Sequence, residues 1–74
     1  MTTNDVSRGL KASAERVLHT RNRIKWQRRL NASTVDPQLR QIGEKMLVTL
    51  ENILSTLEET HLLLMKRAQD GVPD

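Results

Sequence analysis

Two histidines and a pair of adjacent glutamates are the side chains of this chain that could do acid–base or metal chemistry. His19 and His61 stand far apart in the sequence and the chain contains no Cys, so the usual zinc-ligand spacings are absent. Glu58 and Glu59 are neighbours, and on a helix neighbouring side chains diverge instead of forming a catalytic pair. There is also no Gly-rich phosphate loop. We therefore expect no enzymatic activity, no bound metal and no cofactor, and we expect His61 to be packed on an apolar helix face.

A basic cluster is the clearest charge signal. Residues 1–36 hold eight Lys or Arg against three acids, whereas residues 37–74 hold four against six. Three interpretations are open: a solvated face that also pairs with acids of the second half, contact with an acidic protein, or contact with the phosphates of a nucleic acid. The cluster consists of Arg21, Arg23, Lys25, Arg28 and Arg29. The acids available for pairing are Glu44, Glu51, Glu58 and Glu59.

The elements that would position these residues are helices. From residue 37 to about residue 69, apolar side chains recur at spacings of three and four, which predicts a long amphipathic helix. Asp36 is a good N-cap, Pro37 suits the first helical position, and Gly71 and Pro73 would end the helix. The predicted apolar stripe comprises Leu39, Ile42, Met46, Leu47, Leu50, Ile53, Leu54, Leu57, Leu64, Met65 and Ala68.

A first helix is predicted from about residue 5 to residue 30. Its apolar face would carry Val6, Leu10, Ala14, Val17 and Ile24. Residues 31–36 would form a short polar turn, and a connection this short favours an antiparallel pair of helices. The sequence therefore predicts an all-α, coiled-coil-like two-helix hairpin in one domain, residues 1–74, with a flexible tail at residues 70–74. At 74 residues its own core would be thin, so we expect a partner or a second copy to complete it.

Two apolar groups do not fit a single stripe. Trp26 and Leu30 lie about 160° and 200° from the Leu10 stripe, counting 100° per residue. Either a kink near residues 19–22 returns them to the core, or they form a second apolar patch of the kind found at interfaces. Residues 62–65 are apolar all the way round their helical turn, which favours a partner-contacting end.

The chain has no apolar run near twenty residues and no charge-then-apolar leader, so we expect a soluble, cytoplasmic protein with no membrane insertion. Trp26 is the only aromatic residue, which leaves little material for a small-molecule pocket. A binding role for a helical protein partner, or self-association, is therefore favoured. The predicted partner-binding residues are Trp26, Leu30, Met46, Leu50, Ile53, Leu57, Leu62, Leu63, Leu64 and Met65.

A short, Cys-free helical hairpin with a Leu-rich second helix ending near Leu62, Leu63 and Leu64 resembles the small E-type co-chaperones of bacterial type III secretion systems, the YscE, SsaE and EscE group. The resemblance covers roughly residues 6–69. It implies a virulence-associated bacterial protein that pairs with a tetratricopeptide-like chaperone, and the pair keeps the needle subunit soluble in the cytoplasm. The competing expectation is a small basic homodimer that forms a four-helix bundle and binds nucleic acid through Arg21, Arg23, Lys25, Arg28 and Arg29.

Overall fold

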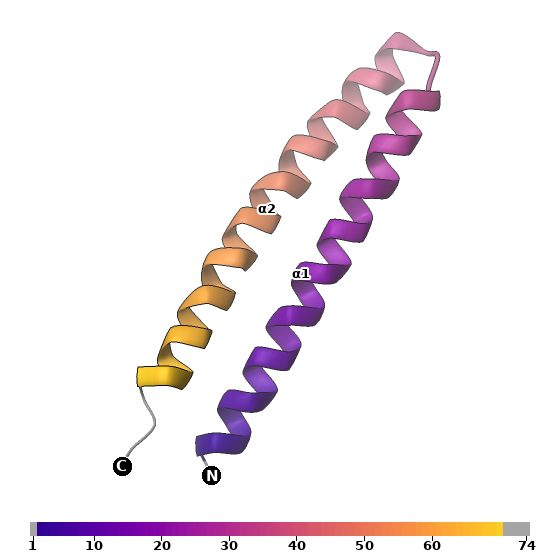
Figure 1. The fold of residues 1–74 in the computed structure, drawn as a ribbon. Coiled ribbons are helices and arrows are strands. Elements are labelled where there is room, and N and C mark those ends of the chain that lie inside the picture. Colours follow the sequence, from indigo (N-terminus) through magenta and orange to yellow (C-terminus); the bar gives the residue numbers. More distant parts are fainter. Residues whose placement is uncertain (1, 71–74) are drawn as a thin grey trace.

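The structure is a computed structural model that describes the backbone of residues 2–70 and the side chains of residues 7–69. It consists of two helices, α1 (Thr2–Ser33) and α2 (Pro37–Asp70). They run antiparallel and side by side along their whole length, so the start of α1 and the end of α2 lie at the same end (Figure 1). The molecule measures 59 × 14 × 13 Å, a rod one helix pair wide. The predicted all-α hairpin is confirmed.

The helix boundaries differ from the predicted ones at the turn. We expected α1 to end at residue 30 and a turn over residues 31–36, but α1 continues to Ser33 and the turn is residues 34–36. The hydroxyls of Ser33 and Thr34 donate hydrogen bonds to the Leu30 carbonyl, at 3.1 and 2.6 Å. Polar residues that suggested a loop thus satisfy one open carbonyl in the last turn of α1, which extends to Ser33. At the other end α1 begins at Thr2 instead of residue 5.

The start of α2 follows the sequence closely. The Asp36 carboxylate accepts hydrogen bonds from the backbone N–H groups of Gln38 and Leu39, at 2.8 and 3.3 Å, which is the geometry of an N-cap. Across the turn the Arg40 guanidinium donates to the Thr34 carbonyl, with Nη2 at 2.8 Å. The cap and this bond fix the turn. The last helical residue of α2 is Asp70, and the predicted terminators Gly71 and Pro73 lie outside the described residues.

A heptad pattern joins the two helices. The least exposed positions on both helices follow one another at alternating spacings of three and four, as in a coiled coil. We call them the seam. On α1 the seam consists of Leu10, Ser13, Val17, Thr20, Ile24, Gln27 and Asn31. On α2 it consists of Gly43, Leu47, Leu50, Leu54, Leu57, His61, Leu64 and Ala68.

The α1 side of the seam is more polar than predicted. Val17 and Ile24 are buried as expected, but Ser13 and Thr20 are buried between them, and the expected Ala14 is exposed. Ser13 takes the place of Ala14 because Val17 and Ile24 set the middle of the seam, and by helical position Ser13 lies about 30° from it whereas Ala14 lies about 70° from it. The side chain of Val6 lies outside the described residues. The core is thin as a result, with Val17, Ile24 and Leu50 as its buried apolar residues.

The predicted α2 stripe is in fact two neighbouring stripes. Leu47, Leu50 and Leu54 lie in the seam, whereas Met46 and Ile53 precede seam positions by one residue and are exposed. Further along, Leu57, Leu64 and Ala68 are half-buried in the seam, and Met65, one residue after Leu64, is exposed on the other flank. The interval of one residue rotates a side chain by about 100°, which takes it from the seam to the flank of the helix pair.

Candidate interaction surfaces

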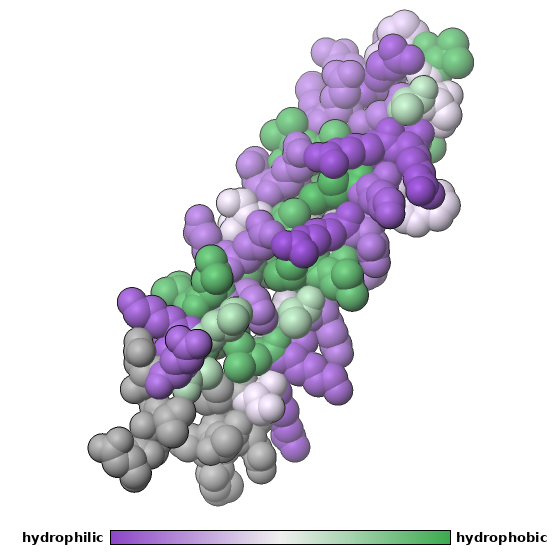
Figure 2. Space-filling model, viewed as in Figure 1, coloured by the Kyte–Doolittle hydropathy of each residue, from purple (hydrophilic) through white to green (hydrophobic). Residues whose placement is uncertain are grey.

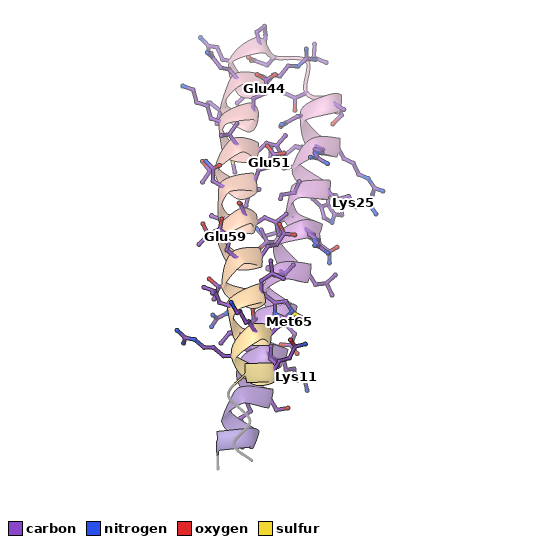
Figure 3. All side chains as sticks on the ribbon, turned by 60° about the vertical axis from the view of Figure 1, so that its left-hand side comes forward. Lys11, Lys25, Glu44, Glu51, Glu59 and Met65 are labelled. Carbon is purple, nitrogen blue, oxygen red and sulfur yellow. The ribbon has the colours of Figure 1, made fainter. Side chains whose placement is uncertain are left out.

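One flank of the helix pair carries the interhelical ion pairs. Arg21 Nη2 lies 2.7 Å from Glu58 Oε2, and Arg28 Nη2 lies 3.1 Å from Glu51 Oε2. We call this flank the charged face. Figure 3 shows Glu51 between the two helices, whereas Glu59 lies on the outer side of α2. Seen in space-filling form, hydrophilic side chains alternate on the visible surface with hydrophobic atoms that show between them (Figure 2). All four paired residues are substantially exposed to solvent, so each pair contributes at most about 1 kcal/mol.

The basic cluster is therefore divided. Arg21 and Arg28 are used within the hairpin, as the interpretation of a solvated face that pairs with α2 expected. Arg23, Lys25 and Arg29 are exposed and form no ion pair among the side chains of residues 7–69. Glu44 and Glu59, two of the four acids proposed for pairing, likewise form none within that range. Lys25 and Arg29 line a hollow on the charged face together with Arg28, whereas Arg23 borders the opposite flank.

His61 is a packed seam residue. Its Nδ1 lies 3.0 Å from the hydroxyl oxygen of Ser13 on α1, and the ring is half-buried. The hydrogen bond joins the two helices at the end away from the turn. Among the residues that the structure describes, no three His, Cys, Asp or Glu side chains gather into a possible metal site. The position of His61 thus agrees with the packing role expected for it.

The opposite flank is an apolar face at the turn end of the rod. Trp26 and Leu30 of α1 line a groove of about 280 Å³ with Met46 of α2, and Arg23 stands at its border. Ile42 and Ile53 lie on the Met46 side of α2, within about 40° of it by helical position, and Leu39 lies one turn nearer the hairpin turn. Each of these apolar side chains is exposed, from Ile53 at 44% to Trp26 at 71%. We call this surface the turn-end face; it comprises Trp26, Leu30, Leu39, Ile42, Met46 and Ile53.

The turn-end face settles the two interpretations of Trp26 and Leu30. Helix α1 is continuous from Thr2 to Ser33, and both side chains are exposed, so the kink expected as one alternative is wrong. They form the second apolar patch. Leu39 and Ile42 belong to the same face but were not predicted as binding residues. A signal for them was present, because they precede heptad positions of α2 by one residue or lie one turn from such a residue.

The predicted partner-binding residues fall into three groups. Trp26, Leu30, Met46 and Ile53 lie on the turn-end face. Leu50, Leu57 and Leu64 instead lie in the seam, so in the closed hairpin they pack against α1 and not against an outside partner. The remaining three are exposed near the end of α2, away from the turn; they are Leu62, Leu63 and Met65. Leu64 alone of residues 62–65 is half-buried.

Comparisons with known proteins identify no relative of this chain. No family model matches the chain, and neither a curated protein nor a solved structure shows significant similarity to it. Within the described residues, neither helix is both long and apolar enough to cross a membrane.

Proposed function

We propose that the chain is a non-enzymatic protein–protein binding module and that its turn-end face docks a helical protein partner. The observation that carries the proposal is the contrast between the three buried apolar side chains found among residues 7–69 and an exposed apolar face of six. Clusters of exposed apolar side chains mark interaction sites on protein surfaces. Burying six side chains that are 44–71% exposed contributes on the order of 10 kcal/mol before the costs of association are subtracted.

The shape of the surface favours a helix as the occupant. Two parallel rows of side chains, one from each helix, form a groove between them at Trp26, Leu30 and Met46. A third helix laid in such a groove presents its own ridge of apolar side chains and completes a three-helix bundle. A bundle of this kind would also supply the burial that a 74-residue hairpin lacks.

The resemblance to the E-type co-chaperones suggests which pathway such a module would serve. We propose that the partner is a larger helical chaperone and that the pair acts in the cytoplasm of a bacterium to keep a type III secretion needle subunit soluble. The hairpin layout and the apolar second helix support this assignment. Under it, the chaperone would cover the turn-end face.

Site-specific photocrosslinking tests the binding role. A photoreactive residue would be placed at Met46 on the turn-end face and, as a matched control, at its neighbour Lys45, which is exposed on the outer side of α2. In the native host we expect a crosslink to a second polypeptide from position 46 and none from position 45. Mass spectrometry of the adduct then names the partner. Equal crosslinking from both positions, or none from position 46, would contradict the proposal.

Nucleic acid is the second candidate, favoured by the three cations of the basic cluster that form no ion pair among residues 7–69, namely Arg23, Lys25 and Arg29. Its signature is salt dependence, because each phosphate neutralised releases counterions. Titration of duplex DNA at about 50 mM and 200 mM salt would show a steep loss of affinity if this role is real. Absence of binding at the lower salt concentration would exclude it.

A further inference from the structure

We infer that the occupant of the turn-end face is an acidic amphipathic helix, with Asp or Glu beside its apolar ridge where it meets Arg23. This inference rests on the proposed binding function and specifies the chemistry of its partner. It follows from how charge is distributed relative to the seam.

The carboxylates of α2 that border the seam lie on only one flank of the helix pair. On α2, the residues one position after seam positions include Glu44, Glu51 and Glu58, which lie on the charged face. The residues one position before seam positions include Met46 and Ile53, which lie on the turn-end face. The carboxylates of α2 that border the seam are therefore on the wrong side to pair with anything docked at Trp26.

The borders of the turn-end face carry cations instead. Arg23 stands at the groove beside Trp26, and Arg16 lies two turns earlier on the same flank, where it lines a hollow with Leu57. On α2, Arg67 lies on the same flank but two heptads beyond Ile53, about 21 Å past the end of the face, so Arg23 is the cation at the groove itself. Glu15, next to Arg16, is the acid that lines the same hollow, and it faces outward from the seam. Arg23 and Arg16 form no ion pair among residues 7–69.

A second copy of the chain is a poor occupant of this face. A twofold dimer uses the same surface on both copies, so each copy would bring Arg23 and Arg16 and no bordering carboxylate of α2. Such an interface would bury apolar side chains while it brought like charges together, which opposes association. A helix with flanking carboxylates buries the same apolar side chains and also pairs with Arg23.

The length of the face sets the length of the partner helix. Leu39 and Ile53 are fourteen residues apart, which corresponds to about 21 Å along α2 at 1.5 Å per residue. The occupant therefore needs about fourteen to eighteen helical residues. Trp26, the only tryptophan, lies on the face at 71% exposure, so its emission reports occupancy directly.

A peptide display selection on the full chain tests the inference. The library would hold 18-residue helical peptides with a fixed Leu/Ile ridge and with flanking positions drawn from Glu, Lys and Ser. We expect the selected peptides to carry mostly Glu on their flanks and to shift the Trp26 emission to shorter wavelength. Replacing Glu by Lys in a selected peptide should weaken its affinity at least tenfold, and the difference should shrink at about 0.5 M salt.

Two charge reversals of equal size give the matched control. Arg23→Glu lies beside the groove and should weaken binding of the acidic peptide at least tenfold, whereas Lys25→Glu lies toward the charged face and should change it less than twofold. Circular dichroism confirms that each variant keeps its helical content. Equal effects of the two variants would overturn the charge argument.

The remaining outcomes separate the inference from the proposed function. Selected peptides with unbiased or Lys-rich flanks would overturn the acidic partner while leaving the binding role intact. No selected peptide, together with a dimer in sedimentation that Met46→Asp disrupts, would make a second copy the occupant. No selected peptide and a monomer in sedimentation would overturn both. If the Trp26 emission shifted to shorter wavelength with duplex DNA but with no peptide, nucleic acid would be the ligand of the turn-end face and the acidic helix would be ruled out.

Discussion

Substituting Ala for the two helical glycines should have opposite effects on stability. At Gly9 an added methyl group meets nothing within 4 Å, so Gly9→Ala should stabilise the hairpin by about 1 kcal/mol through helix propensity alone. Gly43 is a buried seam residue, and a methyl group there would overlap Asn31 Oδ1 and approach Asn31 Cγ to 3.0 Å and Gln27 Nε2 to 3.2 Å. The side chains of Asn31 and Gln27 on α1 therefore already fill the space beside Gly43 on α2.

The cost at Gly43 follows from what must move. Gln27 Nε2 donates a hydrogen bond of 2.8 Å to Asn31 Oδ1, and displacing the Asn31 side chain breaks it, which costs about 1 kcal/mol. Overpacking of the seam costs a further 1–3 kcal/mol or so. Against the same gain of about 1 kcal/mol in propensity, Gly43→Ala should destabilise the hairpin by about 1–3 kcal/mol.

Urea unfolding followed by circular dichroism measures both variants. It should be repeated at two protein concentrations so that any self-association is detected. A third variant, Gly43→Ala combined with Asn31→Ala, removes the obstructing side chain and should recover most of the lost stability. If Gly43→Ala proved as stable as Gly9→Ala, Asn31 would be free to move and the close approach of the helices at Gly43 would not be required.

Three further expectations follow from the seam and its flanks. Thr20→Val replaces the polar side chain of a buried seam residue beside Leu57 and should raise the free energy of unfolding by about 1 kcal/mol, whereas a lower urea midpoint would contradict this. A double-mutant cycle on Arg28 and Glu51 should give a coupling below about 1 kcal/mol that falls in 1 M salt, and a coupling above about 2 kcal/mol would contradict the exposed geometry. Leu57→Asp should lose helical content by circular dichroism because it places a charge in the seam, whereas Met46→Asp should keep it; similar losses in both would show that Met46 is also structural.

The sequence was sufficient for the hairpin and for the start of α2, but not for the end of α1 or for the identity of the seam. Asp36 and Pro37 form a local signal that needs no tertiary context, and the cap they predict is present. The seam depends on how two helices wind around each other, which shifts the effective period from 3.6 to 3.5 residues per turn. Ser13 lies nearer than Ala14 to the row of Val17 and Ile24, but its polar side chain hides it from a search for apolar positions. Polar seam residues such as Thr20 and Asn31 have the composition of a surface, so no hydrophobic pattern reveals them.

The candidate surface was half predictable for a related reason. Trp26 and Leu30 were set apart from the first stripe by their angles, and the structure exposes them. On α2, however, apolar residues occupy both seam and flank, so Leu57 and Met46 could not be separated without knowing which side α1 covers. The packing of α1 determines which of the two adjacent apolar rows of α2 is interior, so the sequence of α2 alone does not reveal it.

The rod shape determines how the association state of this protein has to be measured. The radius of gyration is 16.9 Å, whereas a compact chain of the same length would have about 11 Å. An elongated particle diffuses and migrates through a porous column like a heavier compact one. In size-exclusion chromatography a monomer of 8.5 kDa would therefore elute early, at the volume expected for a compact dimer. Only methods that weigh the particle, such as sedimentation equilibrium or light scattering, distinguish a lone hairpin from a pair.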